Sequence, residues 1–218
     1  MKSPRRRLVA WAALIGAISA LGFAGRFSGQ RPPSDAVFRW DTFGNEAVLY
    51  AIVLAIVLAI ARGLARRDAF ALRPPCSWAA AARVVVGVLI VLYVVAGALD
   101  RVLHAGREQG LTTSHWEPRH AAAFAANYAV LGLLGPAVEE LTFRGLGFRL
   151  LERFGSWTAI ILVGIAFGLW HGLVFAFPIL ALVGAGLAYV RWRTGSLYPC
   201  IVLHALFNTL ALVGPFVA

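Results

Sequence analysis

Residues 121–151 read AAAFAANYAVLGLLGPAVEELTFRGLGFRLL. A helix needs about 20 apolar residues to cross a bilayer, and this stretch has them, yet it also carries Glu139, Glu140 and Arg144. On insertion scales, three charges at membrane depth cost about 7–10 kcal/mol together. We therefore expect a membrane-spanning helix whose charged side chains face the interior of a helix bundle.

The composition of the whole chain points to the same class. Of its 218 residues, 60% are hydrophobic and 14% are charged, and the mean hydropathy is +0.77. A soluble domain is about 45–50% apolar and 25% charged, and a chain of this size cannot hide the excess in one core. A soluble globular protein is therefore excluded. The two cysteines, Cys76 and Cys200, are too far apart in the sequence for a disulfide framework.

Seven stretches are candidates for transmembrane helices. They are residues 8–25, 46–63, 83–99, 121–151, 157–176, 177–190 and 197–217. The first two are plain runs of Leu, Ala, Ile and Val without internal charge. We expect 8–25 to be a retained span, because it is longer than the apolar part of a typical signal peptide and no clean cleavage site follows. The sequence thus predicts an all-α, polytopic helix bundle of about seven spans.

The distribution of basic residues predicts the orientation. With the N-terminus inside, the inner segments and the fourth span hold about 14 of the 20 Lys and Arg residues, and the outer loops hold the other six. The net charge of +10, which by itself could suggest nucleic acid, then reflects inner loops that face an anionic leaflet. We predict no nucleic-acid partner. The Arg- and Ala-rich chain is typical of a bacterial cytoplasmic membrane protein, with its N-terminus inside and its C-terminus outside.

The two glutamates of the fourth span differ in their local partners. Glu140 and Arg144 are four residues apart, with the acid first, which is the favoured order for an ion pair on one helix. Glu139 lies about 100° around the helix from Glu140 and has Phe143 at i+4. It therefore has no partner on its own helix. Just before the glutamates, Gly135-Pro136 should kink the helix and free a carbonyl group.

Polar residues of two later spans fall at a similar depth. His171 follows Phe167 by four residues, and His204 precedes Asn208 by four, so each pair lies on one helical face. Counting 1.5 Å per residue from the inner ends, Glu139 lies about 20 Å deep and His171 about 22 Å. His204 and Asn208 lie about 12 and 18 Å deep. We predict one buried polar site between the C-terminal helices.

Each of these features also has a purely structural explanation. The Glu140–Arg144 pair can link a helix to its bundle, a buried His is often only a hydrogen-bonding group, and His204 with Asn208 can join two helices. A structural network, however, does not need a second, unpaired glutamate beside the first. The combination therefore favours catalysis.

The chemistry that fits these residues is hydrolysis by an activated water. A desolvated carboxylate is a suitable general base for a water molecule, and a neutral His beside it can orient that water. His204 and Asn208 can both donate N–H groups to a developing oxyanion. A zinc site of two His and one Glu is the chemical competitor, but no close ligand spacing such as H-E-x-x-H is present. We therefore predict no bound metal and no other cofactor.

Three motifs in this order resemble those of the CPBP family, which comprises the type II CAAX prenyl endopeptidases and their bacterial, bacteriocin-processing (Abi) relatives. The motifs are Glu139-Glu140-Leu-Thr-Phe-Arg144, Phe167-x-x-x-His171 and His204-x-x-x-Asn208. The resemblance covers about residues 121–212. It implies a division into N-terminal transmembrane helices and loops (1–120) and a CPBP-like catalytic core (121–218).

The resemblance implies an intramembrane, glutamate-type endopeptidase that needs no metal and acts on a membrane-embedded or membrane-associated peptide. Glu139 would activate water with help from His171, with Glu140 and Arg144 as neighbours, and His204 and Asn208 would form the oxyanion site. Two other functions stay open. One is a non-catalytic immunity or binding protein on the same fold. The other is a proton-coupled transporter, which the lack of an internal repeat disfavours.

Overall fold

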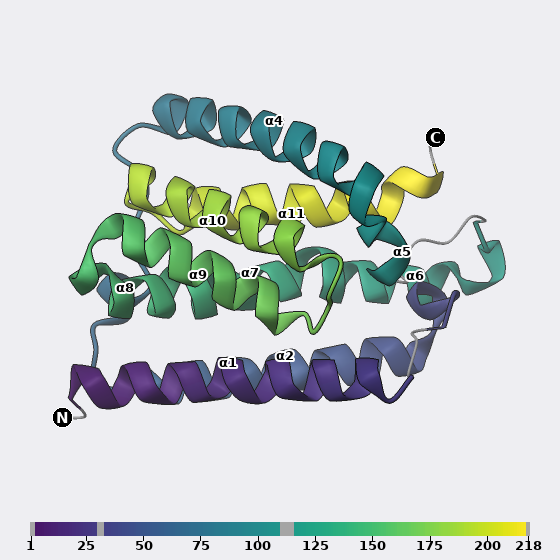
Figure 1. Ribbon diagram of the computed structural model, residues 1–218, viewed down its shortest axis with the longest axis horizontal. Helices are drawn as coiled ribbons and strands as arrows, with labels where there is room; N and C mark the ends of the chain where they lie inside the picture. The colour runs from purple at the N-terminus through teal and green to yellow at the C-terminus, as the bar shows by residue number, and fades with distance from the viewer. Residues whose placement is uncertain (1–2, 30–32, 110–115, 217–218) are drawn as a thin grey trace.

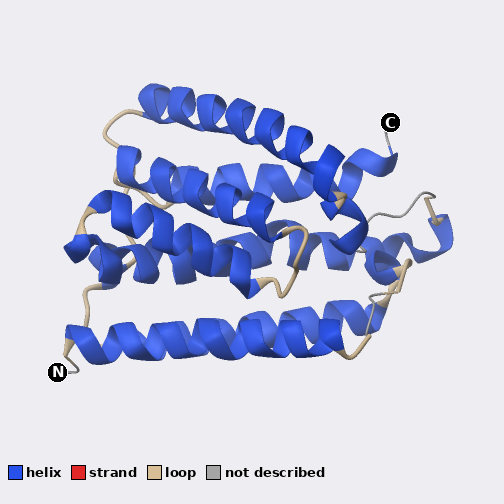
Figure 2. Cartoon of the chain, in the orientation of Figure 1, coloured by secondary structure: helices blue, strands red, loops and turns tan. Residues whose placement is uncertain are grey.

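The computed structural model of the protein describes residues 3–29, 33–109 and 116–216. In these ranges all regular structure is helical (Figure 2), which confirms the predicted fold class. The longer elements are α1 (Pro4–Phe27), α2 (Trp40–Ile60), α4 (Trp78–Leu103), α9 (Ser156–Trp170), α10 (Phe177–Thr194) and α11 (Tyr198–Val213). Short helices occupy Ala36–Phe38, Arg66–Ala69 (α3) and Ala105–Gln109 (α5).

One further helix, here called the long helix, runs without interruption over Pro118–Phe154. Its middle alternates between α- and π-helical geometry. The parts are α6 (Ala121–Asn127), a π-helical segment (Tyr128–Leu134), α7 (Gly135–Glu140), a second π-helical segment (Leu141–Gly147) and α8 (Phe148–Leu151). The helix therefore continues through Gly135-Pro136, and the disturbance expected there takes the form of a π-helical turn.

The helices lie side by side in a bundle, with α1 and α2 on one side and α4 on the other (Figure 1). Among the described residues, four segments are long and apolar enough to cross a membrane: α1, α2, α4 and the long helix. The helices α9 and α11 are apolar but shorter. Each of the seven predicted stretches coincides with one helix, so the chain is a polytopic helical membrane protein. That all seven cross the bilayer stays a prediction.

Two predicted boundaries were wrong, and both errors concern the site. The second span was expected from residue 46, but α2 begins at Trp40, so Glu46 lies inside the helix. The fifth span was expected to continue to residue 176, but α9 ends at Trp170. Its 15 residues extend only about 22 Å. His171 therefore caps the end of α9 instead of standing on its face.

The pair α9 and α10 packs closely because glycines remove side chains from the interface. A Cβ atom at Gly164 would lie 2.7 Å from the carbonyl oxygen of Ala181, and one at Gly184 would lie 2.9 Å from the Cα atom of Gly164. The backbones of the two helices thus approach each other directly, as small residues at a helix interface allow. This contact holds the end of α9, and with it His171, against the rest of the bundle.

Candidate active site

The predicted polar residues gather around one cavity of about 540 Å³ inside the bundle. Four of the six line it directly: Glu139, His171, His204 and Asn208. The remaining lining is mostly apolar and comes from α1, α2, α5, α9, α10, α11 and the long helix; examples are Ile18, Leu49, Val183 and Phe207. Glu140 and Arg144 lie outside the cavity wall and are fully buried. The common depth expected for these side chains thus corresponds to a common site.

The ion pair expected between Glu140 and Arg144 is present. Arg144 Nη1 donates to Glu140 Oε1 at 2.9 Å, and both side chains are 0% exposed. Arg144 Nη2 donates to the carbonyl oxygen of Gly184 at 3.0 Å, and its guanidinium lies 4.4 Å from the centroid of the Phe167 ring. The buried charge is therefore compensated by a carboxylate, a backbone carbonyl and an aromatic face.

His204 lies between the two glutamates. Its Nδ1 is 2.8 Å from Glu140 Oε1, and its Nε2 is 3.8 Å from Glu139 Oε2. Since an ionised carboxylate can only accept, Nδ1 carries the proton in the contact with Glu140. Only Nε2 is left to act in the cavity. Glu140 thus orients His204 and pairs with Arg144 through the same oxygen.

Glu139 has no partner on its own helix, as expected, but it has one on α2. The hydroxyl of Tyr50 donates to Glu139 Oε1 at 2.9 Å. The other oxygen, Oε2, has no hydrogen-bond partner in the described part of the chain. Glu139 therefore presents one occupied and one free carboxylate oxygen, and it lines the cavity.

His171 is oriented by the last turn of α9. Its Nδ1 lies 2.8 Å from the carbonyl oxygen of Phe167, and a carbonyl accepts, so Nδ1 is the protonated nitrogen. In the neutral imidazole, Nε2 then carries a lone pair. The spacing Phe167-x-x-x-His171 is thus used through the backbone of Phe167, while the Phe167 ring lies 4.8 Å from the imidazole centroid.

Asn208 reaches the long helix at the point where a proline interrupts its hydrogen bonds. Asn208 Nδ2 donates to the carbonyl oxygen of Leu131 at 2.9 Å. In π-helical geometry this carbonyl would bond to the N–H of the residue five positions later, which is Pro136 and has none. The carbonyl group expected to be freed by the proline therefore has a partner on α11. One N–H of the Asn208 amide remains for another acceptor.

The segment after His171 is held by a buried glutamate of α5. The Glu108 carboxylate accepts the backbone N–H groups of residues 174–176 at 2.8–3.0 Å and pairs with Arg26 at 2.7 Å. Burial alone would raise the pKa of Glu108, but these hydrogen bonds and Arg26 hold it below its ordinary value. Helix α5 thereby fixes the connection between α9 and α10 beside the cavity.

Tyr50 and Glu46 on α2 are site residues that sequence reasoning missed. Both line the cavity, and their spacing of four residues places them on one face of α2. That spacing of two polar side chains within an apolar run was the available signal. It was overlooked because the helix was expected to begin at residue 46, which placed Glu46 at the end of the span and not within it.

The described residues include no group of three or more His, Cys, Asp or Glu side chains arranged to hold a metal ion. The two His and one Glu of the competing zinc site, His171, His204 and Glu139, all line the cavity, but they do not form such a group. The contacts that these side chains make are to Phe167, Glu140 and Tyr50.

Fold and site together define a polytopic helical membrane protein with a buried polar cavity. Residues 121–210 match the family model described as type II CAAX prenyl endopeptidase Rce1-like. The match covers the region that carries the three motifs, and it supports the predicted assignment to the CPBP family of CAAX-type proteases. No curated protein and no solved structure matches the chain. All six predicted site residues lie within the matched region, whereas Tyr50 and Glu46 lie outside it.

Proposed function

We propose that the protein is an intramembrane endopeptidase that hydrolyses a peptide bond of a membrane-associated or lipidated substrate with a water activated by Glu139. The observation that carries the proposal is the state of the Glu139 carboxylate. One oxygen accepts the hydroxyl of Tyr50, and the other is free and belongs to a side chain that lines the cavity. A buried carboxylate with one free oxygen is suited to accept a proton from water.

The reaction then needs one proton acceptor, and no covalent bond forms between the enzyme and the substrate. A water held between Glu139 Oε2 and the lone pair of His171 loses a proton to Glu139 while its oxygen bonds to the peptide carbonyl carbon. The C–N bond of the resulting tetrahedral intermediate then breaks, and Glu139 returns the proton to the leaving amine. Atoms and charges balance without a further reactant.

The oxyanion of the intermediate would be stabilised by donors from α11. Asn208 has a second amide N–H, and His204 can offer Nε2–H when its ring is protonated. Glu140 and Arg144 serve this step indirectly, because Glu140 fixes the ring of His204.

The lining of the cavity favours a substrate that comes from the bilayer. Apart from the polar residues above and the histidines, its walls are mainly leucine, isoleucine, valine and aromatic side chains, with a few glycine and alanine residues. Such a surface suits an apolar or lipid-modified peptide segment. We place the protein in the bacterial cytoplasmic membrane with its N-terminus inside, and propose the lipid bilayer and a membrane peptide as its partners.

The test is a cleavage assay with purified protein in detergent against a library of membrane peptides, with and without a strong chelator. We expect products from the wild type that persist with the chelator, disappear in Glu139→Gln and persist in Glu152→Gln, a matched change outside the cavity. Activity that depends on stoichiometric zinc would identify a zinc-dependent membrane hydrolase instead. A folded wild type that binds a peptide and cleaves none would identify a non-catalytic binding or immunity protein.

A further inference from the structure

We infer that Tyr50 is a positioning residue for the general base Glu139, so that the active site extends beyond the family's three motifs onto α2. The inference rests on the proposed function. Tyr50 lies 89 positions before Glu139 and outside the region that matches the family model. Its hydroxyl is nevertheless the one donor to the Glu139 carboxylate in the described ranges.

The contact is buried and direct. Tyr50 is 8% exposed and Glu139 is 5% exposed, and the hydroxyl donates to Oε1 at 2.9 Å. Occupation of Oε1 leaves Oε2, which has no hydrogen-bond partner among the described residues, as the oxygen that can accept a proton. The hydrogen bond thus decides which carboxylate oxygen is available and fixes its direction.

The long helix is shaped to receive the Tyr50 ring. A Cβ atom at Gly135 would lie 2.7 Å from the Tyr50 hydroxyl oxygen and also 2.7 Å from the ring carbon that bears it. Real Cβ atoms do not approach so closely, so only glycine fits there without a shift of the ring. Gly135 precedes Glu139 by four residues and lies on the same face of the helix. The glycine therefore provides the space through which α2 reaches Glu139.

The other charged groups around Glu139 do not replace this donor. Arg144 is paired with Glu140, and His204 Nε2 is 3.8 Å from Glu139 Oε2. The Nδ1 atom of His171 is bonded to a backbone carbonyl. Glu46 is another carboxylate on the cavity wall. A hydrogen bond donated to a carboxylate favours its ionised form. Among the described residues, Tyr50 is thus the group whose hydrogen bond orients the Glu139 carboxylate.

The experiment compares Tyr50→Phe with Tyr128→Phe in the full-length protein. Both variants lose one hydroxyl and keep the ring, but the Tyr128 hydroxyl bonds to Thr209 Oγ1 at 3.0 Å and does not line the cavity. For Tyr50→Phe we expect kcat to fall about 10- to 100-fold, the range for loss of a hydrogen bond to a charged group. KM should stay within about twofold, and the acidic limb of the pH profile of kcat should move to higher pH. Tyr128→Phe should change none of these.

An infrared titration tests the contact without relying on cleavage. The carbonyl band of protonated Glu139 is identified by its absence from Glu139→Gln, and it should appear at higher pH in Tyr50→Phe than in the wild type. A folded Tyr50→Phe with normal kcat and an unmoved band overturns the inference. A fall in kcat with an unmoved band also overturns it, because Tyr50 would then act elsewhere. If the wild type cleaves nothing, the proposed function fails, and the band alone decides whether Tyr50 controls Glu139.

Discussion

Two adjacent residues, Glu139 and Glu140, have opposite surroundings in this molecule. Glu140 lies outside the cavity wall and contacts Arg144 and His204 through Oε1, whereas Glu139 lines the cavity and accepts the hydroxyl of Tyr50. The offset of about 100° between neighbours on a helix is the cause, since it directs them to different sides of the bundle. Adjacent carboxylates can thus take different tasks: one anchors a cation and a histidine, and the other remains available for chemistry.

We predict that substitution of Glu140 and Glu139 by Gln separates stability from turnover. Glu140→Gln removes the carboxylate from a fully buried Arg144, and an uncompensated buried charge costs about 3–5 kcal/mol. Its first defect should be a lower melting temperature or lower yield in detergent. Glu139→Gln should stay folded and lose cleavage. Melting and turnover of both purified variants are measured side by side. An unstable Glu139→Gln beside a folded, inactive Glu140→Gln would reverse the assigned roles.

At the scale of elements, the long helix shows how irregular helical geometry is tolerated at membrane depth. Each π-helical segment loosens the backbone ladder, and side chains of other helices occupy carbonyl groups within them. Asn208 Nδ2 donates to the carbonyl oxygen of Leu131 in the first segment, and Trp11 Nε1 donates to the carbonyl oxygen of Thr142 in the second, both at 2.9 Å. Unpaired carbonyl groups in a membrane interior cost several kcal/mol. These contacts therefore hold α11 and α1 in register with the helix that carries both glutamates.

This dual role of Asn208 leads to a prediction. Asn208→Ala should slow turnover by about 10²–10³ through loss of an oxyanion donor. It should also lower stability by about 1–3 kcal/mol, because the Leu131 carbonyl loses its partner. Pro136→Ala supplies a backbone N–H at the position of the missing donor. In that background, the stability loss caused by Asn208→Ala should shrink while the loss of turnover stays.

A double-mutant cycle of these two substitutions, with melting and turnover as readouts, checks the prediction. Additive stability effects would show that Asn208 and Pro136 are not coupled through the Leu131 carbonyl. Normal turnover with weakened substrate binding in Asn208→Ala would make Asn208 a substrate contact instead of an oxyanion donor.

The sequence predicted the helices better than the contacts between them. Apolar runs indicated every long helix, and the spacing of Glu140 and Arg144 indicated their pair, because both are local properties of the chain. The partner of Glu139 was not predictable in this way, since Tyr50 is brought to it only by the packing of α2 on the long helix. The end of α9 at Trp170 was missed because the apolar run continues through 172–176, where Glu108 holds the backbone. The roles assigned to the six motif residues stay predictions.

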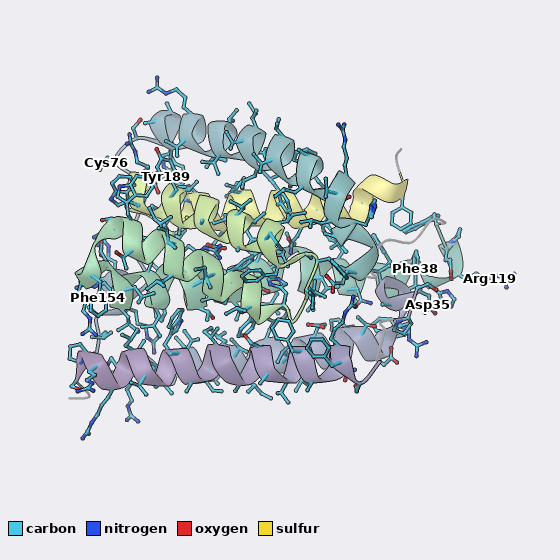
Figure 3. All side chains as sticks on the ribbon, viewed as in Figure 1. Asp35, Phe38, Cys76, Arg119, Phe154 and Tyr189 are labelled. Carbon is cyan, nitrogen blue, oxygen red and sulfur yellow. The ribbon has the colours of Figure 1, made fainter. Side chains whose placement is uncertain are left out.

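On the scale of the whole molecule, the bundle has two chemically different ends. The N-terminus lies at the end where Cys76, Phe154 and Tyr189 are found, and the C-terminus lies toward the end with Asp35, Phe38 and Arg119 (Figures 1 and 3). The first end joins basic segments that are far apart in the sequence. Arg7 Nη2 donates to the carbonyl oxygen of Arg62, and Arg73 Nε donates to that of Gly195, both at 3.0 Å. The other end gathers an aromatic cluster of Phe38, Trp116, Phe124 and Phe216.

This separation leads to a prediction of topology. Positively charged segments are retained on the cytoplasmic side of a membrane, and the end with the N-terminus carries the basic segments around Arg7, Arg62 and Arg73. Because the chain begins at that end and finishes toward the other, an odd number of crossings is required. A reporter fused after Gly63 should therefore report a cytoplasmic position, and one fused after Ala218 an external position. A cytoplasmic signal from the Ala218 fusion would contradict the orientation. If the Gly63 fusion remained cytoplasmic as well, one of the short helices α9 to α11 would have to be a helix that does not cross.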